Sequence, residues 1–256
     1  MSSGMQKLAA GVIAGAAIAG FAVPASAGAS VVAHRHSASA STLAAPEHQL
    51  GAAKAGSNDQ FLAGWYAFTS GGLASASTTF RVPTATCPAS ATTDLGFGVF
   101  GIQAGVSDLG SSSQANVQLD CAGGVVSYYI SAFTAGGGND YVPTNPGDLV
   151  VTSLYENGTN TTATVHDLTT HVTVTSTGAS DLDDQVNTGS YNYFYSAPST
   201  ISGFGKVKFT EAQVNGDYLK YSNPQQLNMA GVHPVQIATG ALTAAGDGFT
   251  QTFRHF

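Results

Sequence analysis

Glutamate, the side chain most suited to acid–base chemistry in an acidic medium, is rare in this chain. Only Glu47, Glu156 and Glu211 occur among its 256 residues. A carboxyl group exchanges protons efficiently with a substrate when its pKa lies near the working pH, so each is a candidate general acid or base. Glu47 lies in an Ala- and Ser-rich segment, Glu156 in a predicted turn and Glu211 near the end of a predicted strand. These settings single out none of the three as a catalytic residue.

The charge distribution excludes one class of partner. No Lys or Arg lies between Arg81 and Lys206, whereas the same interval contains Asp94, Asp108, Asp120, Asp140, Asp148, Glu156, Asp167, Asp181, Asp183 and Asp184. Without a basic patch to neutralise phosphates, nucleic acid is not an expected partner. The surface would lose its self-repulsion as carboxylates protonate, which suits a protein that works in acid. We interpret the last three aspartates as a solvated loop, with access to a cleft as the alternative.

Cysteine and histidine offer little catalytic or metal-binding chemistry. Cys87 and Cys121 do not lie in a nucleophile motif, and in an oxidising compartment they could form a disulfide worth roughly 3–4 kcal/mol. The histidines near the N-terminus are loosely spaced, so no metal site is predicted. His166 and His171 flank a predicted turn and are expected at the surface. No cofactor is predicted.

The N-terminal segment predicts export. Lys7 precedes a small-residue apolar run over 8–23, which Ala25-Ser26-Ala27 follows, as in a secretory signal peptide with its cleavage site. We expect residues 1–27 to be removed, and residues 28–59, rich in Ala, Ser and His, to be a flexible leader or pro-segment. The mature protein is expected to be extracellular and monomeric, without a membrane anchor.

From residue 64 the pattern becomes that of β-strands. Short alternating runs rich in Val, Thr, Tyr and Phe cover 75–82, 96–102, 125–133, 149–155, 161–167, 171–176, 191–195 and 206–212. Turn formers such as Asn145-Pro146-Gly147-Asp148 and Glu156-Asn157-Gly158 separate them. This predicts an all-β antiparallel sandwich over 60–220. The tail, 221–256, could add an edge strand or wrap the sandwich.

Several segments, taken in order, resemble the glutamic peptidase (eqolisin) family, whose fold is a sandwich of two curved antiparallel sheets. Thr79-Phe80-Arg81-Val82-Pro83-Thr84 and Val99-Phe100-Gly101-Ile102 are similar to two family strands. Gln114-Ala115-Asn116-Val117-Gln118-Leu119-Asp120-Cys121 resembles the strand with the catalytic glutamine, which implies that role for Gln114. Pro146-Gly147-Asp148 and Phe204-Gly205-Lys206-Val207 match later segments. The resemblance covers roughly residues 64–216.

The departures from the family bear on activity. A Glu-Trp-Ile-Val-Glu-Ala-Pro segment supplies the family's catalytic glutamate as its fifth residue. It resembles Asn192-Tyr193-Phe194-Tyr195-Ser196-Ala197-Pro198 here, which implies that Ser196 is at the glutamate position. The Trp and Glu of the substrate cleft are replaced by Ser131 and Phe133. A serine hydroxyl cannot act as a general base in acid, and losing that base typically costs roughly 10²–10⁴ in rate. No Gly-x-Ser-x-Gly elbow surrounds Ser196, which argues against a serine nucleophile.

Three hypotheses follow from this pattern. The first is a secreted, non-catalytic relative that keeps its cleft for binding or as a scaffold. The others are an active acid endopeptidase that combines Gln114 with a displaced carboxylate, and a lectin-like protein. Aromatic residues that could line a peptide- or glycan-binding cleft are Tyr128, Tyr129, Phe133, Tyr193 and Tyr195, although cross-strand packing is the simpler explanation. Gln114 could likewise be an ordinary residue on the polar face of a strand.

Overall fold

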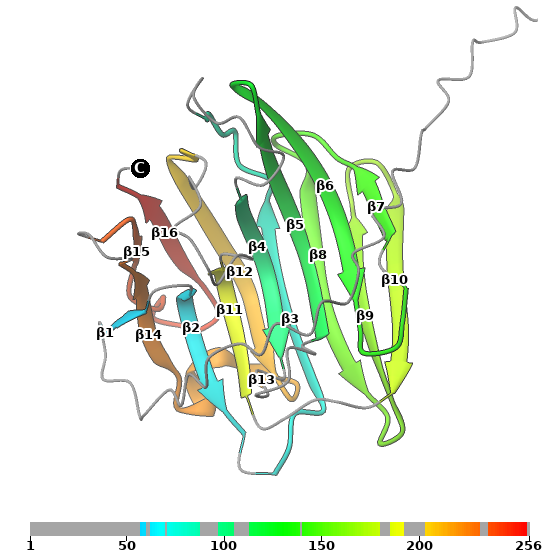
Figure 1. The fold of residues 1–256 in the computed structure, drawn as a ribbon. Helices are drawn as coiled ribbons and strands as arrows, with labels where there is room; N and C mark the ends of the chain where they lie inside the picture. The colour runs from blue at the N-terminus through cyan, green and yellow to red at the C-terminus, as the bar shows by residue number, and fades with distance from the viewer. Residues whose placement is uncertain are drawn as a thin grey trace, which may run out of the picture. The chain divides into compact units, whose positions relative to one another are not determined.

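A computed structural model describes residues 57–59, 62–69, 71–87, 97–104, 113–138, 140–179, 185–191, 203–230 and 235–254 (Figure 1). The signal peptide, nearly all of the predicted leader, Asp181, Asp183, Asp184 and residues 192–202 lie outside these residues. In the described part the only helix is the 3₁₀ turn η1 (Leu219–Ser222). The described residues contain no helix that is long and apolar enough to cross a membrane.

The described chain is almost entirely β-structure, as the period-two pattern predicts. Its strands are β1 (Ser57–Asp59), β2 (Leu62–Phe68), β3 (Ser75–Arg81), β4 (Phe97–Ala104), β5 (Ser113–Ala122), β6 (Val125–Phe133), β7 (Asp140–Pro143), β8 (Leu149–Glu156), β9 (Asn160–Asp167), β10 (Val172–Ala179), β11 (Gln185–Tyr191), β12 (Lys206–Val214), β13 (Asp217–Tyr218), β14 (Gln225–Met229), β15 (Ile237–Thr239) and β16 (Phe249–Phe253). The predicted all-β class is confirmed.

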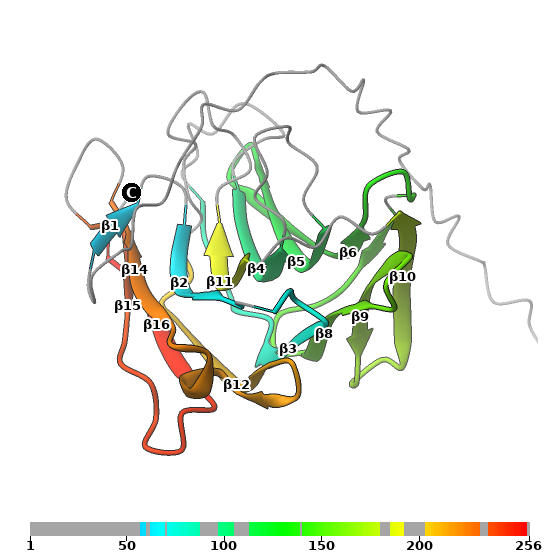
Figure 2. The ribbon, with the colours of Figure 1, turned by 90° about the horizontal axis from the view of Figure 1, so that it is seen from below.

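The strands form one continuous hydrogen-bonded sheet rather than two separate ones. Its order is β10-β9-β8-β3-β12-β16-β15-β14-β2-β11-β4-β5-β6-β7, with β13 added to β12 and β1 added in parallel to β14. The first layer, β2-β11-β4-β5-β6-β7, packs over the second layer, β10-β9-β8-β3-β12-β16, with β4, β5 and β6 against β3, β8 and β9. Figure 2 shows the two layers, joined through β14 and β15.

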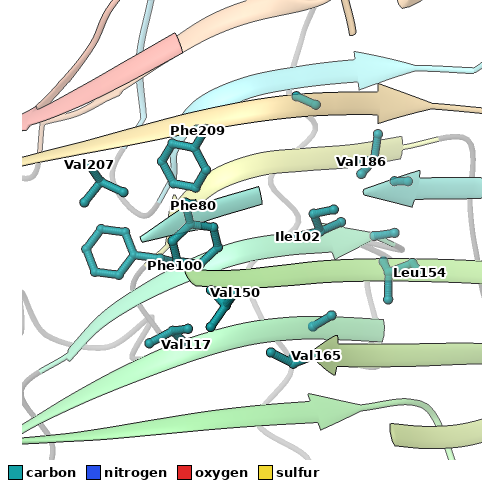
Figure 3. Packing of buried hydrophobic residues seen from close by; sticks show 14 of the residues in the cluster. Phe80, Phe100, Ile102, Val117, Val150, Leu154, Val165, Val186, Val207 and Phe209 are labelled. Carbon is teal, nitrogen blue, oxygen red and sulfur yellow. The ribbon is translucent and has the colours of Figure 1, made fainter. Parts of the chain in front are cut away.

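The hydrophobic core fills the space between the layers, because alternate side chains of each strand point inward. Phe100 and Ile102 from the first layer belong to one buried cluster with Phe80 and Phe209 from the second, and all four are at most 1 % exposed (Figure 3). The Phe209 ring stacks on Phe249 with centroids 4.7 Å apart. Burial of these rings supplies most of the driving force that holds the layers together.

Most predicted strands lie where the sequence places them, within a residue or three at each end, and the Asn145 and Glu156 turns connect β7 to β8 and β8 to β9. The predicted strand 191–195 is described only at Tyr191, the last residue of β11, and residues 192–195 lie outside the described part. The preceding segment, 185–190, is a strand that the sequence pattern does not predict. Asn187 and Gly189 weaken the local strand signal, but hydrogen bonds to β2 on one side and β4 on the other hold this segment extended.

The C-terminal tail takes neither of its two predicted positions. Instead of adding an edge strand or wrapping the sandwich, its strands β14, β15 and β16 lie inside the sheet, between β2 and β12. The last three residues of the predicted leader, 57–59, form β1 and pair with β14. The tail is therefore part of the sheet that links the two layers.

A row of glycines shapes the first layer next to Gln114. Gly64, Gly189 and Gly101 are paired across β2, β11 and β4, and the next residue in the row is Asn116 of β5. All three glycines have φ between +138° and +151°, and a Cβ added at Gly101 would lie 2.2 Å from a carbonyl oxygen. Only glycine fits this conformation and this close approach. The row leaves a strip without side chains that ends at Asn116.

Candidate functional site

The side chains of β5 divide between two faces of the first layer. Ala115, Val117 and Leu119 point into the core and are fully buried. Their neighbours Gln114, Asn116, Gln118 and Asp120 therefore point to the opposite face. We call the surface that carries these four side chains the Gln114 face. It also includes the residues of β4 and β6 that pair with them, because paired residues of a sheet share a face.

Four buried polar side chains on this face form one hydrogen-bond network. The Ser131 hydroxyl donates to Asn116 Oδ1 at 2.8 Å, and Asn116 Nδ2 donates to the Tyr191 hydroxyl at 2.7 Å. The Tyr191 hydroxyl in turn donates to Gln114 Oε1 at 2.8 Å. All four residues are at most 7 % exposed. In such a low-dielectric setting a satisfied network fixes the positions of its members.

The network determines how the Gln114 amide is oriented. Gln114 Oε1 accepts a hydrogen bond from the Tyr191 hydroxyl and a second one, at 3.5 Å, from Asn116 Nδ2. The strands set this geometry, since β5 lies between β6, which carries Ser131, and β4, which pairs with the Tyr191 strand. The two donors described for Gln114 Oε1 are thus a hydroxyl and a side-chain amide, both neutral.

Two of the predicted cleft residues lie on this face. Phe133 pairs with Gln114, and Tyr129 pairs with Gln118 and meets the Tyr141 ring edge-on, with centroids 6.3 Å apart. Tyr129 and Phe133 are partly exposed. They therefore border the network with aromatic surface that a ligand could contact.

Tyr128, a third predicted cleft residue, lies on the other face of β6. Tyr128 pairs with Leu119, packs against the core and accepts a hydrogen bond from the Ala85 backbone at 3.0 Å. Its side chain is on the face opposite Gln114 because neighbouring residues of a strand point in opposite directions. Tyr193, Tyr195 and Ser196 lie outside the described residues.

Asn116 and Tyr191 are the site residues that the sequence does not identify as partners of Gln114. The alternation of Gln114, Asn116 and Gln118 along one strand indicates a shared polar face. Nothing in the sequence, however, indicates that Tyr191, 77 residues away, reaches Gln114. Only the placement of β4 between β5 and β11 brings them together.

Comparison with protein families identifies the relationship. The model of the peptidase A4 family matches residues 60–245, well over half of the chain. This chain belongs to the peptidase A4 family. The resemblance to glutamic peptidases is thereby confirmed.

Solved structures of low sequence identity share the fold of this A4 family member. Scytalido-glutamic peptidase with a transition state analog inhibitor matches with a TM-score of 0.58 and 14 % identity, over 76 % of this chain and 100 % of the other. SCP-B, an eqolisin in a complex with the tripeptide Ala-Ile-His, matches with a TM-score of 0.52 and 16 % identity over the same shares. No curated protein matches this chain.

For an A4 family member, the positions of the carboxylates matter. Of the described ones, Asp120 is on the Gln114 face, but six residues along an extended strand separate it from Gln114 by about 20 Å. Glu156 is in β8 and Glu211 in β12, both in the second layer, and Glu211 accepts a hydrogen bond from Thr79. In the described part of this A4 fold, no group of three His, Cys, Asp or Glu side chains could hold a metal.

The two cysteines are both thiols in this A4 structure. Cys87 Sγ donates to the backbone oxygen of Val125 at 3.5 Å, and Cys121 pairs with Val126, the next residue of β6. Cys87 thus lies beside the β5–β6 hairpin that carries Cys121. The predicted disulfide stays a prediction.

Proposed function

We propose that this protein is an exported, non-hydrolytic member of the peptidase A4 family that binds an extended peptide on its Gln114 face. The observation that carries the proposal is the hydrogen bond from the Tyr191 phenol to Gln114 Oε1. A phenol, rather than a carboxylate, is the group that β11 presents to the glutamine.

The chemistry of a phenol argues against hydrolysis. A tyrosine hydroxyl has an ordinary pKa near 10, so in acid or at neutral pH it stays protonated and cannot accept a proton from water. Here it is the donor in its hydrogen bond to Gln114. Loss of a positioned general base typically lowers a rate roughly 10²–10⁴-fold. The resemblance of the segment 192–198 to the family, which implies a serine at position 196 in place of the glutamate, also supports the proposal.

The composition of the face supports a peptide as the ligand. Neutral amides and hydroxyls recognise peptide groups without requiring a charged partner, and the half-buried rings of Tyr129 and Phe133 offer apolar contacts. The glycine row leaves backbone uncovered by side chains beside Asn116. Two solved relatives of this fold carry peptide-like ligands, one the tripeptide Ala-Ile-His and one a peptide based transition state analog.

A proteolysis assay tests the non-hydrolytic part. The purified mature chain, incubated with a denatured protein across acidic pH, is expected to release no fragments. Tyr191→Glu and Ser196→Glu, made separately, place a carboxyl at each candidate acid position, and gain of cleavage by either would identify the position whose acid is missing. Cleavage by the unmodified chain that disappears in Gln114→Ala would overturn the proposal in favour of an active acid endopeptidase.

A binding screen tests the choice of ligand. We expect the chain to select extended peptides from a peptide library, with Tyr129→Ala and Phe133→Ala each weakening binding about tenfold, the effect of losing a well-packed aromatic contact. Tyr155→Ala is the matched control, since Tyr155 is exposed on β8 of the second layer. Selective binding to a glycan array with no peptide binding would contradict the proposal and support the lectin-like hypothesis.

Export is tested by expressing the full chain in a secreting host. The mature protein is expected in the medium with an N-terminus near Gly28, which N-terminal sequencing determines directly. An intact N-terminus on cell-associated protein would contradict this part of the proposal.

A further inference from the structure

Four polar side chains are buried between the layers without partners. Thr188, Ser190 and Gln251 are 0 % exposed and Thr239 is 5 % exposed. Their three hydroxyl oxygens and both atoms of the Gln251 amide have no hydrogen-bond partner among the groups that the structure describes. We call these four residues the interior polar cluster.

Strand pairing places all four inside the sandwich. Thr188 and Ser190 of β11 pair with Ile102 and Phe100, whose side chains are in the core. Gln251 of β16 pairs with the core residue Val207, and Thr239 of β15 pairs with Gln251. Because paired residues of a sheet share a face, these side chains point to the interior from both sides.

Gln251 reaches across the interior to β11. A Cβ added to Gly189 would lie 2.8 Å from Gln251 Nε2, so the amide lies directly against the backbone of Gly189. Gly189 is flanked by Thr188 and Ser190 in the chain. The amide of β16 and the hydroxyls of β11 therefore occupy one region of the interior, although no direct hydrogen bond joins them.

Such a group of orphaned polar atoms requires an explanation, because buried hydrogen-bonding groups almost always have partners, protein or ordered water. We propose that the interior polar cluster binds ordered water molecules that bridge β11 to β15 and β16. This site is distinct from the Gln114 face, since Tyr191 and the interior residues Thr188 and Ser190 leave β11 on opposite sides.

Water fits the chemistry of the cluster better than an ion does. Hydroxyls and an amide supply both donors and acceptors, as a bridging water needs, and a buried water typically makes about three such bonds. The four side chains are uncharged, so a buried cation would lack a compensating charge, and its desolvation would be costly. Thr188 and Ser190 lie on β11, the strand that carries Tyr191. The waters would therefore hydrogen-bond the interior-facing hydroxyls of this strand and hold it in position.

The direct test is a high-resolution crystal structure of the intact chain. We expect water density within hydrogen-bonding distance of at least two of the cluster's polar atoms. A dry interior in which the Gln251 amide turns to bond Thr188 or Ser190 directly would overturn the proposal. Density at metal–oxygen distances, or a melting temperature that depends on Na⁺ or K⁺ at constant ionic strength, would overturn it in favour of a cation.

A solution measurement gives an independent answer. Water relaxation dispersion counts long-lived internal waters, and we expect Thr188→Val and Gln251→Met each to release at least one while the chain remains folded by circular dichroism. Thr175→Val is the matched control, because Thr175 is exposed on β10. An unchanged count in both variants would contradict the proposal, and the unmodified chain still tests it if a variant fails to fold.

Discussion

The hydroxyl of Tyr191 connects the two amides of the Gln114 network. Its hydroxyl accepts from Asn116 and donates to Gln114, so one atom holds two amides in place. A carboxylate at the same point could accept from Asn116, but it could donate to Gln114 only when protonated. The phenol thus orients the glutamine by donating its proton, and it does so without offering a carboxylate base.

Removal of the Tyr191 hydroxyl should destabilise the fold. Tyr191→Phe takes two hydrogen bonds from buried groups, so the free energy of unfolding should fall by about 1–3 kcal/mol. Urea unfolding followed by fluorescence measures the change. Tyr129→Phe, which keeps the ring contact with Tyr141, should leave the midpoint almost unchanged. Equal midpoints for Tyr191→Phe and the unmodified chain would show that the network does not stabilise the fold.

Buried carboxylates join two connections between strands, the β7–β8 connection and the β9–β10 turn. The Thr144 hydroxyl lies 3.2 Å from Asp148 Oδ2 and 3.0 Å from Asp167 Oδ2. Asp167 Oδ1 also accepts from the backbone of Thr169 and Thr170, at 2.9 and 3.1 Å. The β7–β8 connection and the β9–β10 turn are therefore held together through Thr144.

The pKa of Asp167 makes this junction sensitive to acid. Burial raises the pKa, but hydrogen bonds from Thr170, Thr169 and Thr144 outweigh it and hold the pKa below its ordinary value of 3.8. Because the pKa is depressed in the folded state, the carboxylate stabilises the fold fully above the unfolded value. That stabilisation is lost as the pH falls through the folded value.

Asp167→Asn tests this junction. At about pH 7 the variant should unfold with a free energy lower by about 1.5–3 kcal/mol, the range for hydrogen bonds to a charged group. The difference from the unmodified chain should begin to shrink below about pH 3.8, where the unfolded chain takes up a proton, and should be lost as the pH falls through the lower pKa of Asp167 in the folded state. Asp217→Asn is the control at an exposed position. A difference that stays constant with pH would contradict the role of the charge.

The described part of the chain is a single sheet that folds over itself, and it depends on contacts between residues far apart in sequence. The segment around Cys87 is held by Thr86, which pairs with Gly203, and by the Cys87 contact with Val125. A disulfide from Cys87 to Cys121 would therefore join this segment to the β5–β6 hairpin. In the unfolded chain it would close a long loop.

We predict this disulfide in the exported protein. Its reduction should lower the free energy of unfolding by roughly 3–4 kcal/mol, the entropy of closing such a loop. Mass spectrometry after alkylation without reductant should find no free thiol, and a mass 2 Da below that of the reduced chain is expected from the loss of two hydrogens. Two alkylated cysteines per denatured, unreduced chain would contradict the prediction, and Cys87→Ser/Cys121→Ser serves as the control for the loss of stability.

The alternation of apolar and polar residues was sufficient to predict the strands in which every second residue is buried. The strands near 75–82, 125–133 and 206–212 could be predicted because alternate residues enter a core. Gln114 itself was found by family resemblance. The strand over 185–190 could not be predicted, because hydrogen bonds to β2 and β4 hold extended a segment whose own propensity is weak.

The sequence by itself determined the all-β class, the scarcity of glutamate and the positions of β3, β4, β6, β8, β9, β10 and β12. The tertiary structure alone decided that Tyr191 meets Gln114, that Tyr128 faces the core and that the C-terminal strands join the two layers. The physical reason is that period and composition act between near neighbours in the chain. Which strands become adjacent, and in what register, depends on pairing across tens of residues, and that pairing determines which side chains meet.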